Sequence, residues 1–192
     1  MSGSESRDSD AAPADSVQAA ELLLSKGFLT RDPACAQSHF SRLSPPATHS
    51  LTRTPIASWP AIRTRHVLAF IASVTQSFAE LKLLSIYRIF TRLRARRAAR
   101  VPSAASDPDP QRLCELVFVF ALLRPYLFRS RDACMLDSLA LAHYLLYFGV
   151  PSRWVFGVQD APFTSHCWLV NGTAVLNDSV EHVSGYVPLL EV

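Results

Sequence analysis

The stretch CMLDSLALAHYLLYFGVPSRWVFGVQDAPFTSHCWLVNGTAVLND, residues 134–178, decides the fold that we expect for this chain. Its first part, residues 134–148, has apolar side chains at helical spacing, and Gly149 is typical of a helix end. Residues 152–159 are rich in Val, Trp and Phe, which favours a strand. Two further apolar runs flank an Asn-Gly pair at 171–172, a pattern typical of a tight β-hairpin. Together these patterns predict an α+β fold in which one helix packs on a small antiparallel sheet.

Cys134 is a candidate nucleophile because it stands at the predicted start of the helix. Asp132 or Ser130 could cap that helix. Unsatisfied backbone N–H groups and the helix dipole at such a position favour a thiolate, and the same N–H groups could stabilise an oxyanion. The position alone still favours a small buried side chain, since free cysteines are usually buried.

His166 and Asp178 favour the nucleophilic role of Cys134 over the structural one, because the predicted hairpin carries one of them on each strand. On neighbouring strands the carboxylate could fix the imidazole tautomer, while the other ring nitrogen would accept the proton of the Cys134 thiol. A two-residue loop at the Asn-Gly pair would place Asn177 opposite His166. A three-residue loop, or a bulge with Gly172 left-handed, would place Asp178 there instead. We expect the second register, with Asn177 as the alternative orienting residue.

The other Cys and His residues near this stretch fit structural roles better. Cys167 should point away from His166 and belong to the core. His143 lies about 2.5 turns beyond Cys134, on the opposite face of the helix. His182 could line the cleft, although a surface position is the simpler interpretation. The sequence has no CxxC or HxxxH pair, which argues against a structural zinc site.

The chain before this stretch divides into segments of different composition. Residues 1–15 are polar and acidic, which favours a disordered tail. Residues 16–100 are interpreted as a helical N-terminal region. It comprises a short helix at 16–27, a Pro-rich loop at 30–63 and a long helical pattern at 62–100.

A Pro-rich linker at 101–110 is predicted to join this region to a C-terminal domain at 111–192. Asp109 and Pro110 favour the opening of a further helix there. The segment before the linker ends in RIFTRLRARRAAR, residues 88–100, with six Arg and no acidic residue. It is interpreted as a solvated helix end, or alternatively as a surface for an acidic peptide or an anionic partner.

Composition favours a globular protein. The hydrophobic content of 49% is enough for a buried core, and a formal net charge of +3 is too small to indicate nucleic-acid binding. The longest apolar run, residues 113–128, contains Glu115 and Arg124 and is shorter than the ~20 residues of a membrane-spanning helix. We therefore expect a buried helix and no membrane association. The polar N-terminus lacks the features of a secretory signal, which predicts a cytoplasmic protein with four free thiols.

With these motifs identified, the chain resembles the peptidase domain of the lasso-peptide maturation B protein, a family similar to bacterial transglutaminase-like proteins. The shared motifs are C-x-x-x-S-L-A-L from Cys134, V-x-G-V at 155–158, P-F-x-S-H-x-W at 162–168 and V-L-N-D at 175–178. They fall within residues 111–192. The resemblance implies a transglutaminase-like, papain-like cysteine peptidase fold. By the same resemblance Cys134 is the nucleophile, His166 the base and Asp178 the orienting residue.

The resemblance also implies a substrate and partners. The substrate is a lasso-peptide precursor, whose leader is removed through an acyl-enzyme. The partner is an asparagine-synthetase-like cyclase that uses ATP, and the chain itself is expected to bind no cofactor or metal. Fused relatives grip the leader with an N-terminal module that begins with β-strands. Residues 1–15 show no strand pattern, and residues 16–100 are interpreted as a remnant of that module.

Two other functions are compatible with the same residues. The first is acyl transfer by the same Cys-His-Asp triad, as in transglutaminases, because thiolate attack and the acyl-enzyme are common to both reactions. The second is a non-catalytic role as a docking partner of the cyclase.

Overall fold

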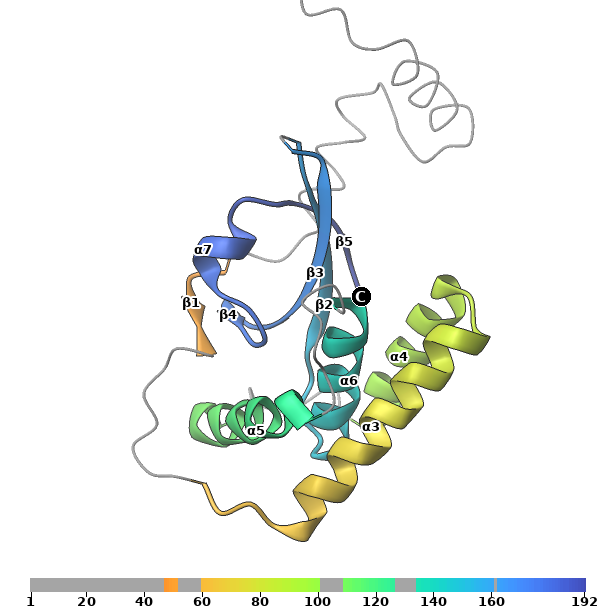
Figure 1. Ribbon diagram of the computed structural model, residues 1–192, viewed down its shortest axis with the longest axis vertical. Coiled ribbons are helices and arrows are strands. Elements are labelled where there is room, and N and C mark those ends of the chain that lie inside the picture. Colours follow the sequence, from red (N-terminus) through yellow and green to blue (C-terminus); the bar gives the residue numbers. More distant parts are fainter. Residues whose placement is uncertain (1–46, 52–59, 101–108, 127–133, 161) are drawn as a thin grey trace, which may run out of the picture. The chain divides into compact units, whose positions relative to one another are not determined.

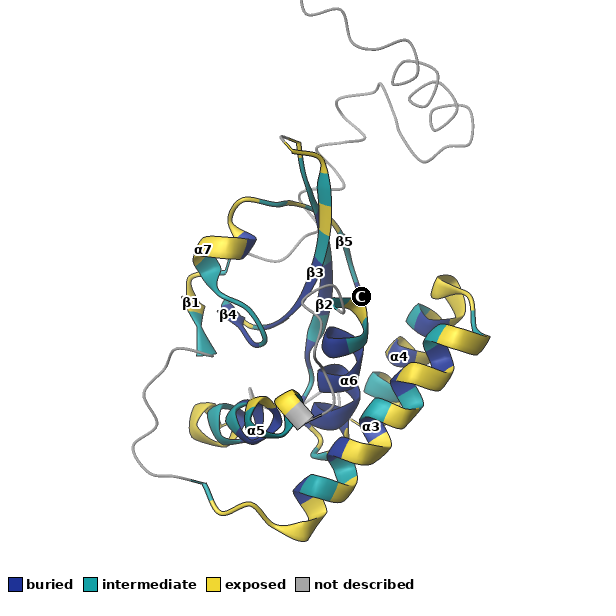
Figure 2. Ribbon diagram, in the orientation of Figure 1, coloured by how far each residue is buried: buried dark blue, intermediate teal, exposed yellow. Residues whose placement is uncertain are grey.

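The helix that begins at Cys134 is the centre of the fold. The computed structural model describes residues 47–51, 60–100, 109–126, 134–160 and 162–192, all within the unit Leu43–Val192. Helix α6 (Cys134–Tyr147) contacts the sheet and also helices α3, α4 and α5 (Figure 1). Every residue of α6 from Asp137 to Leu146 is buried (Figure 2). A helix that is buried all round belongs to the core, and this fixes its first residue relative to the sheet.

The sheet has five strands in the order β1-β4-β3-β2-β5. Strands β2 (Arg153–Gln159) and β3 (Thr164–Asn171) are antiparallel, and β5 (Val187–Glu191) pairs with β2. The short strand β4 (Ala174–Val175) continues the hairpin, and β1 (His49–Ser50) pairs with it in parallel. The α+β class, the strand at 152–159 and the hairpin are thus confirmed. The sequence patterns did not predict β1, β5 or the short helix α7 (Val180–Val183).

The hairpin turn differs from both predicted registers. Asn171 pairs with Ala174, so the two turn residues are Gly172 and Thr173. Gly172 has φ +57°, and a glycine at the first central position is typical of a type II′ hairpin turn. The β3–β4 pairing ends at Val175, and the chain leaves the sheet before residue 178. Neither Asn177 nor Asp178 therefore lies opposite His166 across a ladder, as the predictions required.

The helical pattern at 62–100 forms two helices instead of one. Helix α3 (Thr64–Leu83) ends where Leu84 adopts an extended conformation, with φ −119° and ψ 149°, and α4 (Ile86–Arg100) follows. The buried positions of α3 are mostly polar: His66, Phe70, Ser73, Ser77 and Glu80. The Ser73 and Ser77 hydroxyls donate to backbone carbonyls of their own helix at 2.8 Å, so they are buried with their hydrogen bonds made. Of the apolar residues in the helical pattern, Phe70 is buried, whereas Ile71 and Phe78 are about half-exposed.

A buried polar network joins α3, α4 and α6. Glu80 Oε2 accepts from His143 Nε2 at 2.9 Å, and Glu80 Oε1 accepts from Arg96 at 2.8 Å. Gln76 lies within hydrogen-bond distance of both Glu80 and His143. Burial disfavours the charged form of Glu80, but the hydrogen bond and charge of His143 and the charge of Arg96 outweigh it and lower the pKa of Glu80. His143 therefore has a structural partner on α3.

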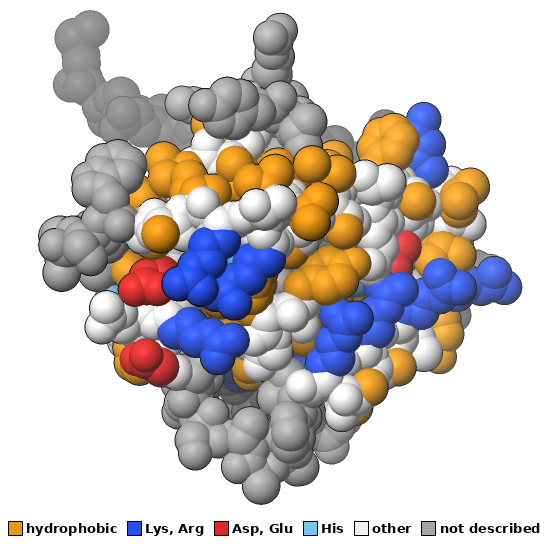
Figure 3. Space-filling view, turned by 90° about the horizontal axis from the view of Figure 1, so that it is seen from below, with side chains coloured by type: hydrophobic (Ala, Val, Ile, Leu, Met, Phe, Trp, Pro, Cys, Tyr) orange, Lys and Arg blue, Asp and Glu red, His pale blue; other side chains and the backbone are white. Residues whose placement is uncertain are grey.

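The Arg-rich end of α4 is partly used within the fold. Arg94 and Arg97 donate to the backbone carbonyls of Glu191 and Ser152, and Arg96 binds Glu80. Figure 3 shows basic side chains gathered on one face among apolar ones. An anionic partner for residues 88–100 remains a prediction.

Helix α5 (Pro110–Leu123) begins as its sequence predicts. Asp109 caps it by accepting from the Gln111 N–H at 3.1 Å, and a short 3₁₀ turn, Arg124–Tyr126, follows it. Among the described helices, none combines the length and apolar character needed to cross a bilayer. The predicted tail at 1–15, the helix at 16–27 and nearly all of the linker lie outside the described residues.

Candidate active site

Cys134 occupies the first position of α6 and is half-buried. Its thiol hydrogen-bonds with the side chains of His166 and Cys167, both on β3. Cys167 itself is 2% exposed and belongs to the core cluster, as predicted. The proposed capping residues Ser130 and Asp132 lie in the undescribed segment 127–133.

The imidazole of His166 lies between Cys134 and Asp178. His166 Nε2 donates to Asp178 Oδ2 at 2.6 Å. A carboxylate only accepts hydrogen bonds, so Nε2 carries the proton and Nδ1 is the ring nitrogen left for the thiol. The structure therefore brings together the three side chains that the sequence singled out, although by a route other than the predicted register.

Asp178 is held from its other side by the start of α7. The Ser179 N–H donates to Asp178 Oδ1 at 2.7 Å. His182 Nδ1 lies 3.0 Å from Oδ1 and 2.9 Å from Oδ2 of the same carboxylate. The Ser179 hydroxyl caps α7 by accepting from the His182 N–H at 3.2 Å. The cap of α7, which is the residue directly after Asp178, therefore helps to turn the Asp178 carboxylate toward His166.

Asn177, the alternative orienting residue, faces helix α6 instead of His166. Its Oδ1 accepts from the Leu169 N–H at 2.9 Å. Its Nδ2 donates to Ser138 Oγ at 2.9 Å and to Asp137 Oδ2 at 3.2 Å. Asp137 in turn forms a 2.8 Å ion pair with Arg124. Asn177 thus ties the departing chain to the first turns of the Cys134 helix, which places the neighbouring residue 178 beside the imidazole.

The hydrogen bonds set the protonation states of the three groups. Bonds from Cys167 and His166 lower the pKa of the Cys134 thiol from 9.0 to about 4, against the effect of burial. Bonds with Asp178 and Cys134 raise the pKa of His166 from 6.5 to about 9, again against burial. Burial opposes ionisation of Asp178, but bonds from His166, His182 and a backbone N–H hold its pKa at about 2. Near neutral pH the site therefore contains a thiolate, an imidazolium and a carboxylate.

A family model described as the transglutaminase-like superfamily matches residues 77–191. The chain belongs to the transglutaminase-like superfamily. That superfamily includes cysteine peptidases and acyltransferases. Neither a curated protein nor a solved structure matches the chain.

The transglutaminase-like domain has a small, mainly apolar pocket beside the thiol. Its volume is about 140 Å³. The lining residues are Cys134, Met135, Phe156, Gly157, Val158, Ser165, His166, Cys167 and Leu189. Apart from His166 and the cysteines, none of them carries an ionisable side chain, so the pocket suits an uncharged part of a substrate.

Two aromatic rings lie against His166: Trp168 on the same strand, β3, and Tyr186 just before β5. The Trp168 ring stacks on the imidazole at 5.9 Å between centroids, and the Tyr186 ring lies at 5.3 Å. Gly157, which pairs with His166 across β2 and β3, leaves room for both rings. A Cβ at Gly157 would lie 2.8 Å from the Trp168 ring and 3.1 Å from Tyr186 Cβ, so the rings would have to move.

Gly157→Ala is expected to disturb the site through these rings. Because Trp168 is buried, we expect a loss of about 1–3 kcal/mol in the free energy of unfolding, measured by urea denaturation. We also expect slower alkylation of Cys134. Gly185→Ala is the matched control, because its nearest contact would be an ordinary 3.5 Å. Equal behaviour of the two variants would contradict the supporting role of the rings.

Among the described residues, one group offers three metal-binding atoms close together: His166, Asp178 and His182, within 4.8 Å of one another. Two imidazoles and a carboxylate are a donor set that zinc accepts. Both ring nitrogens, however, lie at hydrogen-bond distance from Asp178 Oδ2. A hydrogen-bonded chain fully accounts for this geometry.

His182 is the site residue that sequence reasoning undervalued. It was interpreted as a surface histidine, and its side chain is indeed 52% exposed. The available signal was its place three residues after Ser179, which can cap a helix and so turns the chain at His182 back toward Asp178.

Proposed function

We propose that this chain is a cysteine peptidase that removes the leader from a lasso-peptide precursor, with Cys134 as nucleophile, His166 as base and acid, and Asp178 as orienting residue. The observation that carries the proposal is the hydrogen-bonded chain from the Cys134 thiol through His166 to Asp178, at the start of a buried helix. This combination supplies a thiolate at neutral pH and a proton donor beside it. The papain-like form of the fold is part of the proposal.

In the first half of the reaction the Cys134 thiolate attacks the carbonyl carbon of the last leader residue. A C–S bond forms, and the carbonyl electrons move to oxygen, where backbone N–H groups at the start of α6 can stabilise the charge. The C–N bond then breaks. The core peptide leaves as an amine after taking the proton from His166 Nδ1, and the leader remains as a thioester on Cys134.

In the second half water replaces the core peptide. His166, now neutral, takes a proton from water while the oxygen attacks the thioester carbon. The C–S bond breaks, the leader leaves with a new carboxylate, and the thiolate–imidazolium pair is restored. Asp178 stays ionised throughout and holds the imidazole in the required tautomer.

The substrate and partners belong to the same proposal. The motifs around Cys134, His166 and Asp178 support a ribosomally made precursor as substrate and an asparagine-synthetase-like lasso cyclase as partner. ATP is used by that cyclase, and the mechanism above needs no cofactor or metal in this chain. Residues 16–100 as the remnant of a leader-binding module, and a cytoplasmic location, complete the proposal.

The nature of the products tests the proposal. A candidate precursor is incubated with the protein in water enriched in oxygen-18, with and without cyclase and ATP, and the products are analysed by mass spectrometry. We expect a leader fragment whose new carboxylate carries one heavy oxygen from water. An adduct in which the leader is joined to an added amine would support the acyltransferase alternative instead. Maturation that proceeds equally well with Cys134→Ala would support the docking alternative.

A further inference from the structure

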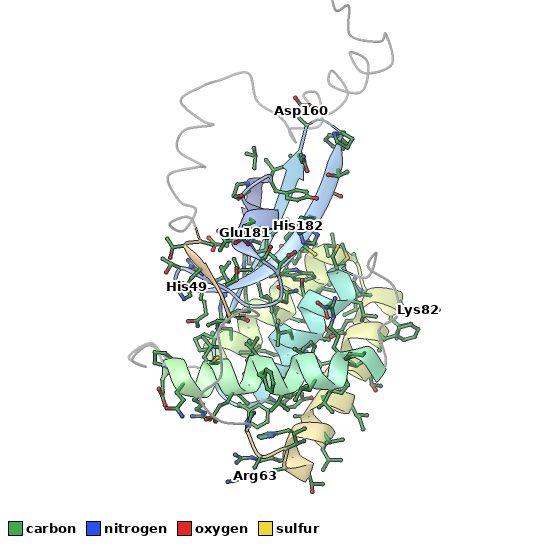
Figure 4. All side chains as sticks on the ribbon, turned by 60° about the vertical axis from the view of Figure 1, so that its left-hand side comes forward. His49, Arg63, Lys82, Asp160, Glu181 and His182 are labelled. Carbon is green, nitrogen blue, oxygen red and sulfur yellow. The ribbon has the colours of Figure 1, made fainter. Side chains whose placement is uncertain are left out.

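His182 is bound to the site more closely than a surface residue needs to be. Its Nδ1 lies at hydrogen-bond distance from both oxygens of Asp178, while His166 binds one of them. The His182 and His166 rings are 4.9 Å apart between centroids, and the Tyr186 ring lies 5.5 Å from His182. Figure 4 labels His182 on the short helix that follows the hairpin.

Asp178 needs such a contact because no ladder holds it. The strand before it ends at Val175, and the Ser179 N–H donates to its Oδ1. Oδ2, the oxygen that accepts from His166, also lies 2.9 Å from His182 Nδ1, so two imidazoles contact the same oxygen. His182 Nδ1 also lies 3.0 Å from Oδ1, so it contacts both oxygens of the carboxylate.

We propose that His182 is a positioning residue, whose Nδ1–H holds the Asp178 carboxylate in the orientation that His166 requires. The inference rests on the proposed function, since it assumes that His166 activates Cys134. It extends the chain of hydrogen bonds by one member: thiol, imidazole, carboxylate and second imidazole. The sequence spacing favours this arrangement, because Asp178 and His182 are four residues apart and the backbone N–H of His182 is already fixed by the Ser179 cap.

The reactivity of Cys134 measures this role without knowledge of the substrate. The rate of carboxymethylation by iodoacetamide is followed from acid to alkaline pH, with mass spectrometry to separate Cys134 from the other thiols. The titratable groups facing the site are Cys134 and Asp137 on α6, His166 and Cys167 on β3, Asp178, His182 on α7 and Tyr186. In the wild type we expect the rate to fall by half only near pH 4.

Two substitutions separate the effect of the His182 hydrogen bond from the effects of the bulk and the charge of its side chain. His182→Leu removes the donor and keeps an apolar side chain, whereas His182→Asn keeps a donor nitrogen at the place of Nδ1. Both keep the backbone N–H of residue 182, which donates to the Ser179 hydroxyl that caps α7. We expect His182→Leu to raise the midpoint for Cys134 by about one pH unit, which slows alkylation about tenfold on the acid limb. His182→Asn should restore most of that loss, and Asp178→Asn should shift the midpoint further than His182→Leu because it alters the direct partner of His166.

Each outcome decides one question. A low wild-type midpoint with no shift in His182→Leu overturns the positioning role and leaves the proposed function intact. An equal shift of the Cys134 midpoint in His182→Leu and His182→Asn also overturns the positioning role, because a hydrogen-bond donor at position 182 would then make no difference. A wild-type Cys134 that titrates like an ordinary thiol overturns the proposed function, and this inference with it. Thermal unfolding of each variant shows whether a shift reflects the site or a loss of fold.

Discussion

Replacing Cys134 by alanine is expected to lower kcat/KM for precursor cleavage by about 10⁶-fold, to the background rate. The expectation follows from the chain of hydrogen bonds through His166 to Asp178, because without the sulfur nothing at the start of α6 can form the acyl-enzyme. The fold should survive, since the Cys134 side chain is only half-buried and alanine favours a helix. The measurement is the time course of leader release, followed by mass spectrometry.

A second cysteine provides the matched control for this loss. Cys114 on α5 is half-buried, and burial together with the nearby charge of Glu115 raises the pKa of its thiol. Cys114→Ala should therefore leave cleavage within about twofold of the wild type, because a thiol with a raised pKa is a poor nucleophile. Substantial cleavage by Cys134→Ala, with a folded protein confirmed by circular dichroism, would rule out the proposed mechanism.

Replacing Glu80 by alanine is expected to give the largest loss of stability, about 3 kcal/mol in the free energy of unfolding. The change removes the acceptor shared by His143 and Arg96 and leaves their donors unmatched next to a buried helix. The value lies at the low end for a broken buried ion pair, because the Arg96 side chain is 37% exposed and stays partly hydrated. Urea denaturation near neutral pH measures it.

The same network predicts how stability depends on pH. The pKa of Glu80 is lower in the folded protein than its ordinary value of 4.5, so the unfolded chain binds the proton more tightly. The contribution of Glu80 to the free energy of unfolding is therefore fully present above pH 4.5. It is lost as the pH falls through the lower pKa that Glu80 has in the folded protein. Glu80→Ala should lack this part of the pH dependence. Arg88→Ala, an exposed change on α4, is the control and should alter stability by no more than about 0.5 kcal/mol. A similar loss in both variants would contradict the role of the network.

The local elements were predictable because short-range rules fix them. Asp109 and Pro110 begin α5, Gly149 ends α6 with φ +74°, and the run at 152–159 forms β2, all as the residue types indicate. Long-range partners were not predictable in the same way. The two residues of β1 form a strand only because they are held beside the hairpin by long-range hydrogen bonds. The Thr48 N–H donates to the Thr173 carbonyl, and the Val180 N–H donates to the Ser50 hydroxyl.

The buried face of α3 shows the limit of hydrophobic periodicity. Its apolar pattern includes Ile71 and Phe78, which are exposed, whereas Ser77 and Glu80 are buried. The polar face is inside because α6 presents His143 there and the small serines satisfy their own hydroxyls. A pattern of apolar residues on one helix contains no information about a polar partner 63 residues away in sequence.

The sequence by itself identified the candidate residues of the site: a cysteine at a helix start, and a histidine and an aspartate that were expected on the two strands of the following hairpin. Residue type and local spacing are enough to identify such groups, because helix ends and hairpins are set by neighbouring residues. Only the tertiary structure decided how the aspartate reaches the histidine. The register set by the Gly172 turn and the cap of α7 are local, but the anchoring of Asn177 to Ser138 of α6, 39 residues earlier in the chain, is a contact between distant segments that the local pattern does not contain.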